Sequence, residues 1–226
     1  MPSDLFHAPS ESHLWNQRLA LALSERWPSA QAPVVTARAG QVLLPSGQPI
    51  TRLPLLLSGR LDCVLPVQQG ESGPFIPISF EAGEIAMLSQ LFCNRPVWVD
   101  VVVAREARLR WLPVPALEAL IESDSTLLHM LTRFLAHRLR DVQLRERSWV
   151  ERGVQQRVRL QLQRLAEKIT PDPQGVRTLH TTHEELAARC GVSRPKLSLA
   201  LKRLEQQGRL LRGRGRLDLL PPSCGG

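Results

Sequence analysis

The stretch CGVSRPKLSLALKRLE, from Cys190 to Glu205, constrains the fold more than any other part of the chain. Gly191 can adopt the positive φ of a tight turn, and Val192 can fill the corner behind that turn. Ser193 is a favourable N-cap, and Pro195 falls in the first turn of the next helix, where its missing N–H costs little. The stretch therefore predicts two packed helices joined by a sharp turn.

The segment before this turn carries the signal of a helix start. Thr182-His-Glu-Glu185 fits a capping box, in which the first and fourth residues satisfy each other's backbone N–H groups. The buried side of this first helix is expected to hold Leu186, Ala187 and Cys190. Two helices joined in this way form a DNA-reading unit, although an ordinary corner between packed helices has the same outline.

The helix after the turn has two different faces. Its inner stripe consists of Leu197, Ala200, Leu201 and Leu204, and cations project from the other side. Cations neutralise phosphates, and arginine paired with guanine is the commonest specific base contact, so Arg194 is our first choice for base readout. The residues expected to meet DNA are Thr182, His183, Ser193, Arg194, Pro195, Lys196, Ser198, Leu199, Lys202 and Arg203.

A basic hairpin is expected after Gly208. Leu210 and Leu211 begin one strand, Leu217 to Leu220 form another, and the turn between them holds Arg212, Arg214 and Arg216. A solvated turn could have the same composition. Beside a helix–turn–helix, however, three arginines favour a wing that contacts the phosphate backbone.

The distribution of charge agrees with this interpretation. Residues 1–149 hold 14 Lys and Arg against 14 Asp and Glu, whereas residues 150–226 hold 15 against 7, so the whole net charge of +8 lies in the last third. Such an asymmetry indicates that the C-terminal part meets a polyanion.

The middle of the chain has the pattern of a β domain. From about Pro33 to Pro113, short apolar runs alternate with turn residues, and glycines at 40, 47, 59, 70, 73 and 83 separate the expected strands. This texture predicts a sandwich or barrel-like domain. Residues 14–27 before it look like a short amphipathic helix.

A long helix is expected from Ser123 or Asp124, as the cap, to about residue 149. It carries a heptad seam, interrupted by Arg138 and Arg145, of Leu128, Leu131, Leu135, Val142 and Trp149. Such a helix can cover its own domain or form a two-helix dimer seam. We favour the dimer seam, because the flanking domains are too small to wrap so long a helix. Gly153 follows as a hinge.

Other chemistry finds no support in the sequence. The HEELA segment from His183 lacks the second histidine of H-E-x-x-H, and no G-x-S-x-G, P-loop or G-x-G-x-x-G occurs. We therefore expect neither catalytic nor metal-binding residues. No C-x-x-C occurs, so the cysteines are expected to be reduced thiols in the cytoplasm: Cys63, Cys93, Cys190 and Cys224. Neither a membrane span nor an export signal is apparent.

Three segments resemble the CRP/FNR family, the cyclic-AMP receptor protein and its relatives. HEELAARCGVSRPKLSLALKRLEQQGRLL is similar to its winged helix, GEIAML…NRPVWVDVVVA to its phosphate-binding cassette, and LTRFLAHRLRD to its dimerisation helix. The resemblance implies an α+β fold with an N-terminal cyclic-nucleotide-binding-like β-roll (a jelly roll) and a C-terminal winged helix-turn-helix. It divides the chain into a helical leader (1–30), a β-roll sensor (31–115), a dimerisation helix and hinge (116–152) and a DNA-binding domain (153–226).

The resemblance also implies an effector site, with departures. Gly83, Glu84 and Arg95 match the cassette, but Pro96 stands where a serine usually follows the arginine. Val142 and Gln143 replace the pair that meets adenine. Cyclic AMP is therefore expected to bind weakly or not at all, and haem, which some relatives bind, is the minority alternative. In the helix–turn–helix, Ser193 and Arg194 match the family, but Pro195 and Leu199 stand where a glutamate and a second arginine help to read DNA, which implies a different operator.

The function implied is that of a homodimeric transcription regulator. It would bind a pseudo-palindromic operator in double-stranded DNA, with RNA polymerase as a partner, and its β-roll would sense an unidentified signal. Two alternatives stay open: a haem-based or other small-molecule sensor of the same family, or a β-roll ligand-binding or scaffold protein with a degenerate C-terminal domain.

Overall fold

The protein is described by a computed structural model that covers residues 11–27, 33–65, 75–93, 95–150 and 153–221, with only the backbone of residues 144, 145 and 147–150. The chain forms two compact units. The N-terminal unit comprises residues 11–68 and 76–142, and the C-terminal unit consists mainly of the residues after 142. Each unit has its own hydrophobic core.

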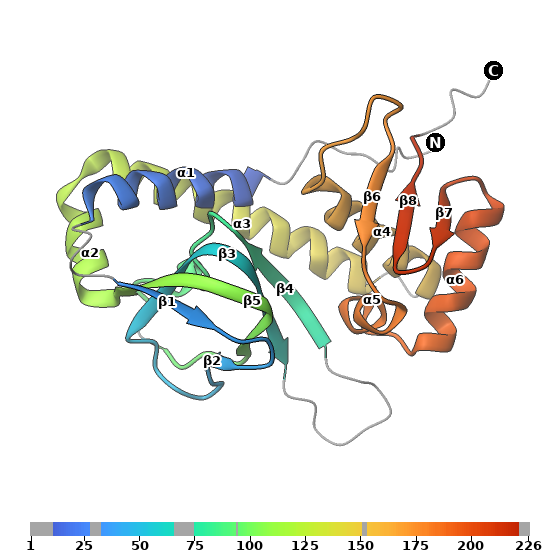
Figure 1. The fold of residues 1–226 in the computed structure, drawn as a ribbon. Coiled ribbons are helices and arrows are strands. Elements are labelled where there is room, and N and C mark those ends of the chain that lie inside the picture. Colours follow the sequence, from blue (N-terminus) through green and yellow to red (C-terminus); the bar gives the residue numbers. More distant parts are fainter. Residues whose placement is uncertain (1–10, 28–32, 66–74, 94, 151–152, 222–226) are drawn as a thin grey trace. The chain divides into compact units, whose positions relative to one another are not determined.

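The N-terminal unit is built around a 5-stranded sheet with the order β1-β5-β3-β4, in which β2 also pairs with β5 (Figure 1). The strands are β1 (Val34–Ala37), β2 (Val42–Leu44), β3 (Arg52–Leu65), β4 (Phe75–Glu81) and β5 (Asp100–Pro113). β1, β2 and β3 all run antiparallel to β5. A short 3-10 helix, η2 (Leu88–Gln90), lies between β4 and β5. The expected β domain is thus present.

Strand β3 is longer than the sequence predicts. Gly59 was expected in a turn, but it lies inside β3, where the register shifts between Leu56 and Leu61. Its φ is +89°, and a Cβ there would lie 2.2 Å from the Glu106 carbonyl oxygen. Glycine is therefore needed for the close approach of β5 within a bulged strand, not for a reversal of the chain.

Three helices pack on this sheet: α1 (Glu11–Arg26), α2 (Val114–Ser123) and α3 (Ser125–Val150). Asp124 caps α3 as predicted, since its carboxylate accepts hydrogen bonds from the N–H groups of Thr126 (2.8 Å) and Leu127 (3.3 Å). The bond from Leu127 above all, together with the bond from Thr126 and the nearby Arg26, lowers the pKa of Asp124. The start of the long helix is therefore fixed by its own sequence.

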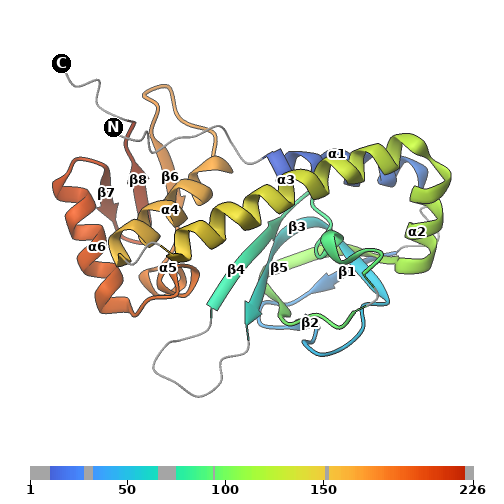
Figure 2. The same cartoon turned by 180° about the vertical axis from the view of Figure 1, so that it is seen from behind.

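Helix α1 lies along α3 with the opposite direction, as Figures 1 and 2 show. At one end Arg26 pairs with Asp124 at 3.0 Å, and at the other Ser12 donates to Asp141. Between them the buried Asn16 side chain makes two hydrogen bonds with the backbone of Ile85, at 3.0 and 2.8 Å. Asn16 thereby fixes the loop that follows β4 to the helix.

The C-terminal unit combines three helices with a 3-stranded sheet of order β6-β8-β7. Its elements are α4 (Val154–Glu167), β6 (Arg177–His180), α5 (His183–Cys190), α6 (Arg194–Gln206), β7 (Leu210–Gly213) and β8 (Arg216–Leu219). Strand β6 was not predicted from the sequence. It pairs with β8 and adds a third strand to the hairpin. Among the described residues, no helix is long and apolar enough to cross a membrane.

We predict that Asn16→Ala destabilises the N-terminal unit by about 2 kcal/mol or more, because it leaves a buried N–H and a buried carbonyl of Ile85 without partners. Urea unfolding monitored by circular dichroism measures the change. Gln17→Ala is the matched control, since Gln17 makes one exposed contact at 3.5 Å. An equal, small effect of both substitutions would contradict the role assigned to Asn16.

Candidate nucleic-acid interface

The turn between α5 and α6 has the geometry that its sequence predicts. The Thr182 hydroxyl oxygen accepts a hydrogen bond from the Glu185 N–H at 3.1 Å and so caps α5. Gly191 ends that helix with φ 60° and ψ 41°. The N–H of Val192 then returns to the Ala187 carbonyl at 3.1 Å, and its side chain is buried. The turn is therefore fixed by hydrogen bonds and by a buried plug.

Ser193 differs from the prediction in one detail. It occupies the N-cap of α6, but its side chain makes no capping hydrogen bond, and its carbonyl oxygen accepts from the Leu197 N–H at 3.0 Å. Pro195 lies in the first turn as predicted. The Ser193 hydroxyl is consequently not used by the start of the helix.

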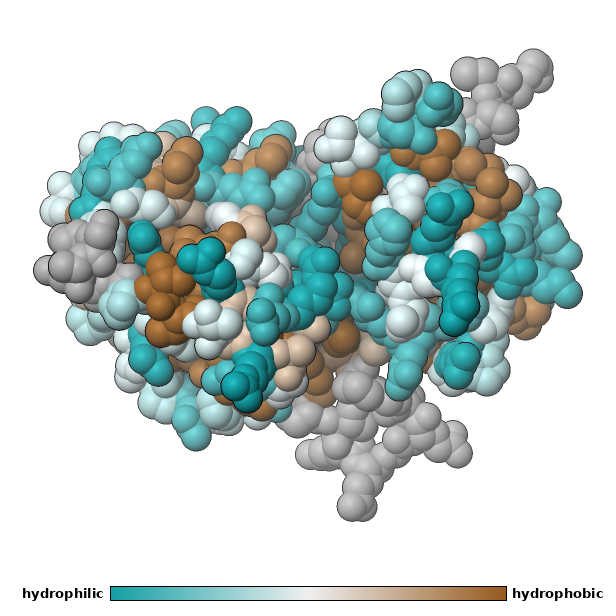
Figure 3. Space-filling view, viewed as in Figure 1, coloured by the Kyte–Doolittle hydropathy of each residue, from teal (hydrophilic) through white to brown (hydrophobic). Residues whose placement is uncertain are grey.

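Helix α6 presents a cationic, largely unpaired outer face. Leu197, Leu201 and Leu204 are buried in the C-terminal core, while the opposite side is exposed. Among the described residues no ion pair involves the exposed cations of this helix: Arg194, Lys196, Lys202 and Arg203. In Figure 3 the edge of the unit where α6 lies is mostly hydrophilic. This face can neutralise phosphates.

Two further predicted residues are joined across the turn. The Ser198 hydroxyl oxygen of α6 lies 3.3 Å from His183 Nδ1 at the start of α5. Both side chains are half-buried. The contact ties the first turn of α5 to the middle of α6 and gives Ser198 an intramolecular partner.

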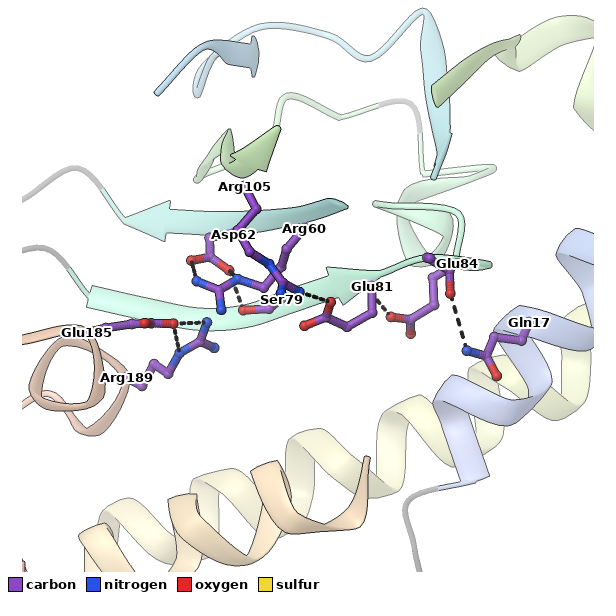
Figure 4. Close-up of polar contacts among 10 residues, drawn as sticks. Gln17, Arg60, Asp62, Ser79, Glu81, Glu84, Arg105, Glu185 and Arg189 are labelled. Carbon is purple, nitrogen blue, oxygen red and sulfur yellow. Dashed lines mark hydrogen bonds and ion pairs between the residues drawn. The ribbon is translucent and has the colours of Figure 1, made fainter. Parts of the chain in front are cut away.

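Glu185 has a role besides the cap that its position suggests. Its Oε1 accepts from the Arg189 guanidinium at 3.2 Å, one helical turn along α5, as Figure 4 shows. Arg189 is only 6% exposed. Because a buried guanidinium needs a partner, this pair allows an arginine to lie on the inner side of the helix.

The wing is a hairpin of β7 and β8 in which Gly213 pairs with Arg216. The three predicted arginines differ in their partners. Arg212 Nε donates to Glu205 of α6 at 2.7 Å, and Arg216 pairs with Asp218 at 3.4 Å. The bond from Arg212 lowers the pKa of Glu205. Arg214, in the turn itself, is exposed and in no ion pair among the described residues.

The Glu205–Arg212 pair therefore attaches the wing to the end of α6. The Arg212 backbone N–H also donates to Glu205, at 3.2 Å. Arg212 was assigned to DNA contact, and this pair was not predicted, although a glutamate in the last turn of a helix and an arginine in the next strand could have suggested it. Within the wing, Arg214 is thus the arginine most available to a phosphate.

Two of the residues assigned to an effector site, Gly83 and Glu84, make hydrogen bonds with the backbone of their own unit. The resemblance assigned Glu84 to the phosphate-binding cassette. Glu84 is 4% exposed, and its carboxylate accepts a hydrogen bond from the Glu81 N–H at 2.7 Å (Figure 4). Gly83, with φ 85°, donates its N–H to the Leu56 carbonyl. Both residues thus take part in the turn after β4, and their assignment to an effector stays a prediction.

Two arginines of the sheet, Arg60 and Arg105, are already in ion pairs. Arg105 pairs with Glu81 at 3.0 Å, and Arg60 pairs with Asp62 at 3.3 Å, while Ser79 also donates to Asp62 at 2.5 Å (Figure 4). Arg95 and Pro96 are exposed, Val142 is half-buried and Gln143 is exposed. Arg95, the cation assigned to the cassette, is thus exposed and in no ion pair among the described residues.

Helix α3 has one buried and one exposed apolar face. The residues of the predicted dimer seam fall on both faces. Leu131 is 3% exposed and packs with Leu127 and Phe134 in the core of its own unit, so it is not available to a partner. Leu128, Leu135 and Leu139 are instead 45%, 39% and 60% exposed. The predicted seam thus includes the buried Leu131 and lacks the exposed Leu139. The Trp149 side chain lies outside the described residues.

Cys190 is a packing residue of the C-terminal core. Burial raises the pKa of its thiol to about 12, against the opposing effect of Arg157 and Arg189. Cys63 is also buried, whereas Cys93 is exposed, and Cys224 lies outside the described residues. Within the described part of the chain no group of His, Cys, Asp or Glu is arranged to hold a metal ion.

Comparisons with known proteins agree with this geometry. Residues 156–222 match the family model of the Crp-like helix-turn-helix domain. No curated protein sequence matches the chain. A CRP/FNR-family transcriptional regulator from Thermus thermophilus is similar in structure, with 24% identity, a TM-score of 0.65 and coverage of 83% of this chain and 93% of the other.

Two further solved structures are similar over most of their length. The c-di-GMP responsive global regulator CLP of Xanthomonas campestris has 20% identity and a TM-score of 0.68, with 88% of this chain and 99% of that chain covered. FixK2 of Bradyrhizobium japonicum has 16% identity and a TM-score of 0.70, with 83% and 92% covered. At these identities the likeness concerns the fold.

The C-terminal unit is a Crp-like helix-turn-helix domain, and the chain as a whole has the fold of CRP/FNR-type transcriptional regulators. The resemblance noted in the sequence is thereby confirmed.

We predict that Cys190 and Cys63 resist alkylation in the folded protein, while Cys93 reacts. At pH 8 a thiol with a pKa of about 12 has roughly one thiolate in ten thousand molecules, and the thiolate is the reactive form. Mass spectrometry after brief treatment with iodoacetamide, with and without urea, measures each site. Rapid labelling of Cys190 in the absence of urea would contradict its burial.

Proposed function

We propose that this protein is a homodimeric, sequence-specific DNA-binding regulator whose β-roll responds to a signal and whose bound dimer acts on RNA polymerase. The observation that carries the proposal is the outer face of α6. Four exposed cations stand there on a helix that a glycine turn and a buried leucine stripe hold in place. A purely structural corner would need none of them.

The helix and the wing divide the contacts with DNA. The N-terminal residues of a recognition helix reach base edges in the major groove, which assigns base readout to Arg194. The remaining exposed cations are assigned to phosphates: Lys196, Lys202 and Arg203 on α6, and Arg214 on the wing. Thr182 and His183 at the start of α5 and Ser193 at the start of α6 are further members of the expected set. The alternative, a β-roll scaffold with degenerate DNA binding, leaves this set of cations unexplained.

Dimerisation is proposed through the outer face of α3. Leu128, Thr132, Leu135, Leu139 and Val142 follow one another at spacings of four and three residues, the heptad pattern of a two-helix seam. The leucines of that row are left 39% to 60% exposed by their own unit. Two-fold symmetry then requires an operator with two half-sites about one DNA turn, roughly 34 Å, apart.

The signal sensed by the β-roll is proposed not to be cyclic AMP. A buried cyclic phosphate needs a cation and several donors. Glu84 is used in a turn, and Pro96 has neither an N–H nor a hydroxyl to offer after Arg95. Haem or another small molecule is the alternative signal, and the visible spectrum of the purified protein tests haem directly.

We predict that Leu135→Asp combined with Leu139→Asp yields monomers that bind operator DNA weakly, because two charges would enter the seam from each helix. Light scattering measures the mass. The matched control is Leu14→Asp with Leu21→Asp, which alters two exposed leucines of α1. A dimeric seam variant that still binds DNA would place the interface elsewhere.

We predict different losses for two arginines. Arg194→Ala should cost roughly 1–3 kcal/mol at one base pair of each half-site and flatten sequence preference. Arg214→Ala should weaken all sequences alike and reduce the salt slope by about 0.9 for each phosphate that is no longer neutralised. Competition titrations at several salt concentrations measure both, with the exposed Arg38→Ala as control. Equal effects of Arg194→Ala on operator and random DNA would refute its assignment to bases.

We predict that cyclic AMP binds at least about tenfold more weakly than to a site with the full set of donors, because one lost hydrogen bond to a charged group forfeits about 1.5–3 kcal/mol. Isothermal titration and operator binding with and without the nucleotide measure this. A low-micromolar dissociation constant coupled to tighter operator binding would show that the interpretation of Pro96 and Glu84 is wrong.

A further inference from the structure

On the solvent-facing side of α6, the N-terminal half of the helix exposes apolar residues. Pro195 and Leu199 are one helical turn apart, and both are exposed on the side opposite the buried leucines. Leu199 is 52% exposed. A single exposed leucine is common on protein surfaces, so its meaning depends on what surrounds it.

Cations surround this apolar pair. Arg194 and Lys196 flank Pro195 along the chain, and Lys202 and Arg203 follow Leu199 within the next turn. The neighbouring hydroxyl of Ser198 faces His183 at 3.3 Å. The centre of the face therefore offers apolar surface, and its margins offer positive charge.

Duplex DNA presents the complementary pattern in its major groove. Phosphates line both edges, and the thymine C5-methyl group is the apolar feature on the floor, which apolar side chains contact. Leucine cannot donate to the acceptors of guanine and would leave them desolvated without partners. Opposite a thymine methyl it covers only apolar surface.

We propose that Leu199, supported by Pro195, reads a thymine methyl group in each half-site, so that thymine is a specificity determinant of this protein's operator. The proposal rests on the proposed function, and it names what one position of that interface recognises. Arg194 then supplies the polar base contact and Leu199 the apolar one.

The test replaces thymine by deoxyuridine, which removes the methyl group and leaves base pairing intact. An operator is first selected from random DNA with the wild-type protein, and each symmetric pair of thymines is then replaced in turn. Loss of one buried methyl corresponds to about a fourfold loss of affinity per half-site, or about fifteenfold for both. We expect one symmetric pair to show this loss.

Leu199→Ala should bind the thymine operator more weakly and should no longer distinguish thymine from uracil at that pair. Leu211→Ala, which alters a leucine of β7 with 53% exposure, should keep the distinction. Circular dichroism verifies that both variants are folded. Because Leu199 lies outside the core, its replacement leaves the packing of α6 intact.

The outcomes distinguish the inference about Leu199 from the proposed function. If an operator is selected but no thymine pair is sensitive to loss of its methyl, or if Leu199→Ala keeps the full sensitivity, the inference about Leu199 is wrong and DNA binding stands. If Leu199→Ala binds the operator as the wild type does, the inference is equally wrong. If no operator can be selected, the proposed function itself fails.

Discussion

The left-handed conformation at Gly191 is the constraint on which the DNA-binding unit depends. With φ 60° this residue ends α5, returns the next N–H to the helix and directs the chain into α6 a few residues later. Any residue with a Cβ is strained there. In this arrangement the apolar side of α6 packs in one core with α5 and α4, and the cations of α6 face outward.

The long helix α3 shows how one element can serve two partners. Leu127, Leu131 and Phe134 complete the core of the N-terminal unit, while Leu128, Leu135 and Leu139 are exposed. Helix α1 adds polar bonds along its length, at Asp124 and Asp141. The two uses considered from the sequence, cover of its own domain and a dimer seam, are therefore compatible, since they engage different faces.

The sequence was sufficient where structure is set by local chemistry. The cap at Thr182, the turn at Gly191 and the buried stripe of α6 all depend on residues within a few positions of one another. It was insufficient where distant segments meet. Nothing local shows that β5 passes close to Gly59, or that Asn16 bonds to the loop after β4.

The same limit applies to the candidate sites. Helix α3 carries two adjacent rows of apolar residues with similar spacing. Periodicity alone therefore did not decide which row is exposed, the one with Leu131 or the one with Leu139. The carboxylate of Glu84 fits a cassette by sequence, and the sequence alone did not show that it also accepts a hydrogen bond from the Glu81 N–H. In the sequence Arg212 is part of a basic cluster, whereas in the structure its guanidinium pairs with Glu205.

Selection of binding sites from random duplex DNA by the full-length protein tests the central claim most directly. A dimeric regulator that reads DNA through α6 should enrich a pseudo-palindrome whose half-sites lie about one helical turn apart. The enrichment should be lost with Arg194→Ala and with the double substitution at Leu135 and Leu139. Enrichment of no sequence, or of a single asymmetric site bound by one chain, would contradict this claim.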